Sequence, residues 1–271
     1  MNLPKSTNLQ WLEMLAAFQD LSRVRQVSPR GKLTYELTGP HVLGPIDLLD
    51  NVITVPKRKL NYAFMCAEAS WILAGSNQLD FLTRFCEKMA DYSDDGRTLS
   101  GAYGPRFKDQ FAYVMERLLT EEQTRQAVMT FWMPNPEPSR DIPCTVSLQF
   151  LIRDNKLDLY VYMRSSDAWL GVPYDIFSFS MIAWSVIGGL NRWRTSGLVT
   201  PGNLWMLTGS RHLYADNAQA SRLVVEAGCS ELPHVMSPPS DKGMMFTECA
   251  TLQHWLLNQA ILIKNGVAKL P

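Results

Sequence analysis

The sequence has no excess charge of either sign and no uninterrupted apolar run long enough to cross a bilayer. Its 26 lysines and arginines equal its 26 aspartates and glutamates. This balance argues against a protein that coats nucleic acid, because such binding depends on neutralising many phosphates. The first residues, Met1-Asn-Leu-Pro-Lys5, also lack the apolar core of a signal peptide. We therefore expect a cytoplasmic protein that binds neither nucleic acid nor a membrane.

Cysteine patterns typical of disulfide frameworks and zinc sites are missing as well. The five cysteines are odd in number, widely spaced and without a Cys-x-x-Cys pair. We expect reduced thiols and no metal. The sequence has no internal repeat and no low-complexity stretch. Its length of 271 residues is enough for a sizeable core, and we interpret residues 1–271 as a single domain.

Apolar periodicity predicts helices and strands in an irregular order. Helical spacing covers residues 11–25, 62–74, 79–92, 107–119 and 175–188, with two further helices from about 217 and 246. Strand patterns cover 32–38, 126–132 and 203–210, and 146–153 with 156–163 form a hairpin through Asp154-Asn155. Because strands and helices do not strictly alternate, the pattern predicts an α+β fold with helices packed on one face of a sheet.

Two segments near the middle of the chain combine chemistry-bearing residues. Cys144 follows a proline in Arg140-Asp-Ile-Pro-Cys-Thr145, and Arg164-Ser-Ser-Asp-Ala-Trp-Leu-Gly-Val-Pro-Tyr-Asp175 comes twenty residues later. Nearby arginines would favour the thiolate, the form in which cysteine acts as a nucleophile. Taken alone, a cysteine is more often a small buried apolar residue, and we keep that interpretation for the other four.

The second segment offers groups for a phosphate and for a base. Arg164 and Ser165 suit a phosphate, because a planar guanidinium donates two parallel hydrogen bonds. Asp175 suits cytosine better than uracil: a carboxylate accepts from the N4 amino group, whereas uracil O4 is another acceptor. An alternative role for Asp175, as the N-cap of the helix that follows, stays open.

These segments resemble the thymidylate synthase superfamily. Thr145 and Asp175 stand where thymidylate synthases have His and Asn, and both differences resemble the deoxycytidylate (dCMP) hydroxymethylase branch. The resemblance implies a twisted mixed β-sheet with packed helices. One sheet face would form a homodimer interface, and the two subunits would share their active sites.

The resemblance also implies roles for individual residues. Glu68 would be the acid/base, Tyr103 would lie near the nucleophile, and Arg125 would reach the phosphate from the partner subunit. In full, the resemblance assigns catalysis to Cys144, Glu68, Asp175 and Tyr103, substrate binding to Arg30, Arg125, Arg164, Ser165, His212 and Tyr214, and folate binding to Asp167 and Gly171. Residues 85–90 lack the tryptophans that thymidylate synthases carry there, which indicates a remodelled folate pocket.

The implied reaction joins a pyrimidine nucleoside monophosphate and a folate. 5,10-Methylenetetrahydrofolate would act as co-substrate and give its one-carbon unit to C5 of dCMP, with water completing 5-hydroxymethyl-dCMP. Four alternatives stay open: a dCMP methyltransferase, an enzyme that accepts CMP, a thymidylate synthase, and a non-catalytic nucleotide-binding regulator.

Overall fold

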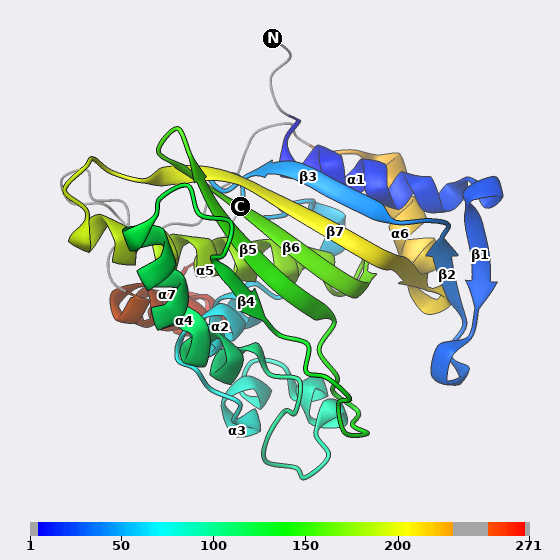
Figure 1. Cartoon of the computed structure of the whole chain (residues 1–271). Coiled ribbons are helices and arrows are strands. Elements are labelled where there is room, and N and C mark those ends of the chain that lie inside the picture. Colours follow the sequence, from blue (N-terminus) through cyan, green and yellow to red (C-terminus); the bar gives the residue numbers. More distant parts are fainter. Residues whose placement is uncertain (1–4, 230–248, 269–271) are drawn as a thin grey trace.

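The computed structural model describes residues 5–229 and 249–268. Within them, seven strands form one mixed sheet in the order β1-β2-β7-β6-β5-β4, with β3 also paired to β7. The strands are β1 (Val24–Val27), β2 (Thr34–Leu37), β3 (His41–Asp47), β4 (Val128–Thr130), β5 (Thr145–Arg153), β6 (Lys156–Asp167) and β7 (Thr200–Tyr214). Only the β6–β7 pair is parallel among these described strands. The expected α+β class and mixed sheet are confirmed (Figure 1).

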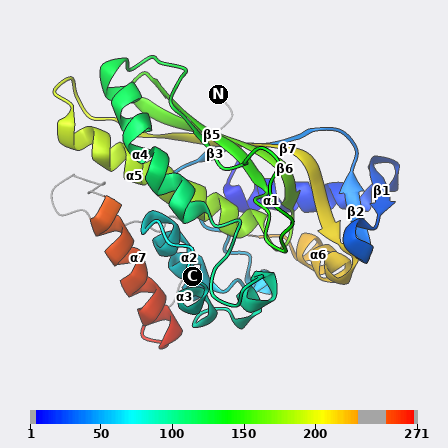
Figure 2. The ribbon, with the colours of Figure 1, turned by 60° about the horizontal axis from the view of Figure 1, so that its bottom comes forward.

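The helices pack mainly on one side of this sheet. They are α1 (Thr7–Ala16), α2 (Tyr62–Leu73), α3 (Leu79–Thr83), α4 (Tyr103–Thr120), α5 (Val172–Trp193), α6 (Ala215–Ala227) and α7 (Cys249–Lys264). Short 3-10 helices occupy Ala17–Gln19, Leu21–Arg23, Pro29–Gly31, Pro56–Arg58 and Glu87–Tyr92. Helix α5 runs beneath the strands, α2 packs against α5, and α7 lies beside α2 (Figure 2).

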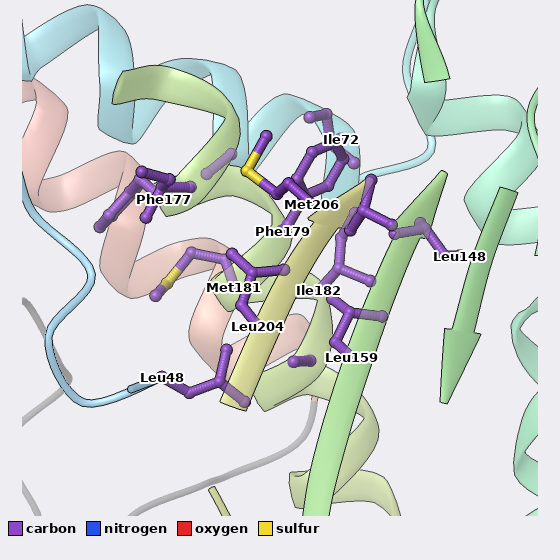
Figure 3. Packing of buried hydrophobic residues seen from close by; sticks show 14 of the residues in the cluster. Leu48, Ile72, Leu148, Leu159, Phe177, Phe179, Met181, Ile182, Leu204 and Met206 are labelled. Carbon is purple, nitrogen blue, oxygen red and sulfur yellow. The ribbon is translucent and has the colours of Figure 1, made fainter. Parts of the chain in front are cut away.

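The core lies between α5 and the central strands. Phe179 and Ile182 of α5 approach Leu159 of β6 and Leu204 and Met206 of β7 (Figure 3). All five side chains are fully buried. Because successive side chains of a strand point to opposite faces, Trp205 and Leu207 point away from this core. No described helix crosses the opposite face, over β5, β6, β7 and β3 (Figure 1).

The β5–β6 hairpin confirms the turn predicted at Asp154-Asn155. Both residues have positive φ, 50° and 58°. Two-residue hairpin turns with this backbone match the twist of the flanking strands, and Asn and Asp tolerate it better than most residues. The hairpin extends β6 to Asp167, so that Arg164 and Ser165 lie near the end of a central strand.

Two predicted helices are shorter than expected. The first ends at Ala16 rather than Arg25, because the Asp20 carboxylate accepts the Ser22 backbone N–H at 3.1 Å and favours a turn. The prediction over 79–92 is also wrong in part: α3 ends at Thr83, and the Asn61 side chain donates to the Phe85 carbonyl at 3.0 Å. The predicted start of the last helix, about residue 246, lies outside the described residues, within which α7 spans Cys249–Lys264.

Candidate active site

Cys144 lies directly before β5, in a segment held by Arg164. The Arg164 guanidinium donates from Nε to the Pro143 carbonyl at 2.9 Å and from Nη2 to the Ile142 carbonyl at 3.0 Å. Its backbone N–H also donates to the Cys144 carbonyl at 2.9 Å, and its guanidinium lies 5.3 Å from the Trp132 ring centre. Arg164 therefore fixes the backbone that presents the thiol.

The charges around the Cys144 thiol oppose one another. Arg164 and Arg30 lower its pKa, as expected from the sequence. Burial has the largest effect, however, and together with the Asp175 and Asp141 carboxylates it raises the pKa of Cys144 above its usual value. The arginines thus favour the thiolate as expected, but burial outweighs them, and the resting thiol is protonated at neutral pH.

Asp175 and Glu68 are two half-buried acids that lie close together. Burial raises the pKa of Asp175 to about 7, against the lowering effect of Arg211. Burial and the neighbouring Asp175 carboxylate raise the pKa of Glu68, which projects from α2, to about 8. Carboxyl groups with such pKa values can give or take a proton near neutral pH, as acid and base catalysis requires.

The structure contradicts the helix-cap alternative for Asp175. Helix α5 begins at Val172, and Gly171 occupies the N-cap position. Asp175 is therefore the fourth residue of the helix, and its own backbone N–H donates to the Gly171 carbonyl at 2.9 Å. Its carboxylate is close enough to Cys144, Glu68 and Tyr103 to raise the pKa of each.

Tyr103 begins α4 and joins this group through its hydroxyl. The Thr145 hydroxyl donates to Tyr103 Oη at 2.8 Å. The Tyr103 ring contacts Phe131 edge-on at 5.0 Å and stacks on Phe179 at 6.3 Å. Burial raises the pKa of Tyr103 well above its usual value, so the phenol stays protonated and can donate a hydrogen bond.

Most of the residues predicted to bind substrate also come together. Ser165 Oγ lies 3.3 Å from His212 Nδ1, and the His212 ring meets Tyr214 edge-on at 5.4 Å. Arg30 has a left-handed backbone, with φ of 53°, and is close enough to lower the pKa of Cys144. Arg125 differs: it is exposed in the loop before β4, and it is not among the charges that act on the Cys144 thiol.

Asp167 and Gly171, which the resemblance assigns to folate, lie close together at the start of α5. Asp167 Oδ1 accepts the backbone N–H groups of Trp169 at 2.7 Å and Leu170 at 2.8 Å. Its other oxygen, Oδ2, is buried and has no hydrogen-bond partner among the described residues. A side chain at Gly171 would crowd Asp175 Oδ2 at 3.2 Å. The residues present thus fit a ligand that donates hydrogen bonds, as a reduced folate does.

Sequence reasoning missed Arg211, the buried cation of this site. Its side chain is 1% exposed and donates to Ser166 Oγ at 2.8 Å and to Thr208 Oγ1 at 3.0 Å. Burial lowers the pKa of Arg211 to about 10, so it remains charged. Sequence patterns offered little signal, because Arg211 stands between the polar residues Ser210 and His212 of β7. Only its burial shows that its charge would be costly without partners.

Two further features are absent from the described residues. In residues 5–229 and 249–268, no group of three or more His, Cys, Asp or Glu side chains could hold a metal ion. Over the same ranges, no helix is long and apolar enough to cross a membrane.

Comparison with known proteins identifies the family. The thymidylate synthase family profile matches residues 24–251. A deoxyuridylate hydroxymethyltransferase of Bacillus phage SP01 is 30% identical over 211 residues, which cover 70% of this chain and 53% of that protein. A deoxyuridylate hydroxymethyltransferase of Pseudomonas phage M6 is 34% identical over 127 residues, covering 44% of this chain and 36% of that protein. The chain thus spans about half the length, or less, of these curated relatives. From the span of the family match, the chain belongs to the thymidylate synthase family.

Proposed function

We propose that the protein transfers a one-carbon unit from 5,10-methylenetetrahydrofolate to C5 of dCMP, with water completing 5-hydroxymethyl-dCMP. The observation that carries this proposal is the Asp175 carboxyl group beside Cys144, Glu68 and Tyr103 in a chain of this family. The folate supplies the carbon. The steps below are those of the chain's own residues.

Cys144 makes the pyrimidine reactive. C5 of a pyrimidine is a weak nucleophile, and addition of the Cys144 thiolate to C6 places electron density on C5. Arg164 and Arg30 favour the thiolate, while burial disfavours it. Cys144 is therefore mostly the neutral thiol at rest, and its proton must pass to a base or to water before the sulfur adds to C6. Glu68, with a pKa of about 8, is the acid/base that moves protons at the base and at the transferred carbon.

Asp175 recognises cytosine in both of its protonation states. The acid donates to N3 and accepts from the N4 amino group. The carboxylate accepts from N4 and stabilises a protonated N3, the charged form that cysteine addition favours. Arg211 keeps the ionised form accessible by lowering the pKa of Asp175. Asp175 thus favours a cytosine nucleotide as substrate, because both of its protonation states can pair with N3 and N4.

The second candidate is the same transfer to dUMP, which the printed names of the two relatives favour. A protonated Asp175 also fits uracil, because its carbonyl oxygen accepts from N3–H and its hydroxyl donates to O4. The carboxylate form does not, since it meets O4 as a second acceptor. The protonation state of Asp175 therefore determines whether its carboxyl group can pair with uracil as well as with cytosine.

Product analysis distinguishes the candidate reactions. The protein is incubated with methylenetetrahydrofolate and dCMP, dUMP or CMP side by side, and the product mass is measured. We expect a hydroxymethyl product from dCMP and no dihydrofolate. A methyl product with stoichiometric dihydrofolate would instead assign a methyltransferase or, from dUMP, a thymidylate synthase. Turnover of none of the three by folded protein would favour the regulator.

We also propose that the protein is a homodimer joined through the helix-free face of its sheet. Trp205 and Leu207 point to that face, Tyr160 stacks on Trp205 at 6.3 Å, and Val42 is 59% exposed. Broad apolar surfaces of this kind are typical of protein interfaces. Arg125, exposed in the loop before β4, would then bind the phosphate in the partner's site.

A further inference from the structure

The segment that carries Cys144 is attached to a second loop as well as to Arg164. We call residues 139–144 the nucleophile segment and residues 93–102 the adjoining loop. The Asp94 carboxylate of that loop accepts the Arg140 backbone N–H at 3.1 Å and the Ser139 hydroxyl at 2.5 Å. In return, the Asp141 carboxylate of the nucleophile segment accepts the Gly101 backbone N–H at 2.7 Å.

The contact between Asp141 and Gly101 leaves no free space. A Cβ atom at Gly101 would lie 2.7 Å from Asp141 Oδ1 and 2.8 Å from the Asp141 carbonyl oxygen. Such distances are too short for any side chain, so the two backbones approach closely because residue 101 is glycine. The nucleophile segment therefore has one defined position relative to the loop.

The adjoining loop is itself firmly held. Asp95 accepts the backbone N–H groups of Arg97 and Thr98, both at 2.7 Å. The Arg106 guanidinium donates to the Ala102 carbonyl at 2.6 Å and to the Ser100 carbonyl at 3.1 Å. This rigid loop leads directly into Tyr103. It supports the nucleophile segment at Asp141, three residues before Cys144.

We propose that Asp141 is a positioning residue for Cys144, because its carboxylate anchors the nucleophile segment to Gly101. Neither the family resemblance nor the comparisons assigns Asp141 a role. Its negative charge also acts on the thiol and raises the pKa of Cys144, so Asp141 helps to keep the resting cysteine protonated. The proposal rests on the proposed function in taking Cys144 as the nucleophile.

Two substitutions of Asp141 distinguish the effect of its hydrogen bond to Gly101 from the effect of its negative charge. Asp141→Ala removes the acceptor for the Gly101 N–H, and displacements of about an ångström cost up to about a hundredfold in rate. We expect kcat to fall roughly 10- to 100-fold, with the nucleotide KM changed by less than about threefold. Asp141→Asn keeps an acceptor oxygen without the charge and should restore most of the lost turnover.

The chain supplies a matched control at the far end of the sheet. Asp158 likewise accepts a backbone N–H, from Asn203 at 2.7 Å, and likewise lies against a glycine, Gly202. Asp158→Ala and Asp158→Asn therefore remove a similar contact away from Cys144. We expect the alanine variants of both series to be less stable. We expect kcat per folded molecule to fall only in the Asp141 series.

Alkylation of the resting thiol gives a readout that needs no turnover. The rate of Cys144 modification by iodoacetamide is followed against pH, with Cys144→Ser as the blank. Because the Asp141 carboxylate raises the pKa of the thiol, Asp141→Asn should move the midpoint to lower pH, and Asp158→Asn should leave it in place. The alkylation profile tests the effect of the Asp141 charge on Cys144 even if no nucleotide is turned over. The proposed role of Asp141 and the proposed one-carbon transfer can therefore fail separately.

The proposal is overturned if Asp141→Ala keeps wild-type kcat. It is also overturned if the Asp141 and Asp158 alanine variants lose activity only in proportion to their loss of folded protein, or if Asp141→Asn leaves the alkylation midpoint unchanged. Gly101→Ala is an independent check: it should displace the same segment and lower kcat as Asp141→Ala does.

Discussion

Asp175 titrates close to neutral pH, and its two forms present different hydrogen-bonding groups to a base. Its pKa is raised from the usual value of 3.8 to about 7, so the carboxyl is mostly protonated below that pH and mostly ionised above it. Uracil requires the acid form, whereas cytosine is compatible with both. Substrate choice should therefore depend on pH.

We predict that the preference for dCMP over dUMP grows with pH. The ratio of the two kcat/KM values should rise about tenfold between about pH 6 and about pH 8, because the protonated fraction of a group with a pKa near 7 falls by that factor. Values of kcat/KM are the appropriate measurement, since they report ionisation of the free enzyme. Asp175→Asn, whose amide both accepts and donates, is the control and should prefer dUMP at every pH. A constant wild-type ratio would remove Asp175 from base selection.

At the residue scale, sequence motifs identified the site residues that stand in recognisable local patterns. Ser165 and His212, far apart in the chain, meet at 3.3 Å because β6 and β7 are paired. Arg211 was missed, since its importance depends on burial beside Asp175, which no local pattern reveals. The net pKa direction of Cys144 was also inaccessible, because burial exceeds the effect of the arginines.

At the element scale, α4 is placed by a close approach to the end of α2. A Cβ atom at Gly104, in the first turn of α4, would lie 2.3 Å from the Ser76 carbonyl oxygen and 2.6 Å from the Ser76 nitrogen. These are backbone atoms that cannot rotate away. The glycine therefore fixes where α4 begins, and with it the position of the neighbouring Tyr103.

We predict that Gly104→Ala lowers the free energy of unfolding by about 1–3 kcal/mol, the usual cost of forcing extra volume into packed structure. Urea unfolding measures the loss. Gly189→Ala in α5 is the matched control, because the one close contact of its added methyl is with the flexible end of Met115, at 2.9 Å. Its loss should be smaller. Equal losses in the two variants would show that the contact with Ser76 has no special weight.

Element boundaries were the least predictable part of the fold. Strand β3 carries Gly44-Pro45 in its middle, and both residues count against a strand in sequence patterns, yet β3 pairs with β7 along most of its length. The over-long helix predicted over 11–25 ignored the local hydrogen bond of Asp20. The β5–β6 hairpin was predictable because its turn chemistry is entirely local.

At the scale of the whole molecule, Arg125 is the residue that one chain leaves unexplained. It is exposed, and its backbone carbonyl accepts a hydrogen bond from Gln149 Nε2 at 3.1 Å. Sequence patterns within one chain cannot predict a residue that acts in a neighbouring subunit. The proposed dimer gives Arg125 a role that its own chain does not.

We predict that inactive Arg125→Ala and Cys144→Ala chains restore activity when mixed under conditions that exchange subunits. In a heterodimer with shared sites, one site combines the native Cys144 of one subunit with the native Arg125 of the other. Native mass spectrometry verifies that heterodimers form, and homodimer samples of each variant are the controls. Activity that stays at the level of the better parent would exclude a shared phosphate site.

The most direct test of the central claim, that Cys144 activates a pyrimidine at C5, is release of tritium from C5 of labelled nucleotide in the presence of methylenetetrahydrofolate. We expect wild-type protein to release tritium from dCMP, with dUMP measured beside it. Release should fall at least about a thousandfold in Cys144→Ser, a loss typical of removing a covalent nucleophile. Undiminished release by the Cys144→Ser protein, or no release from either nucleotide by folded wild-type protein, would contradict the claim.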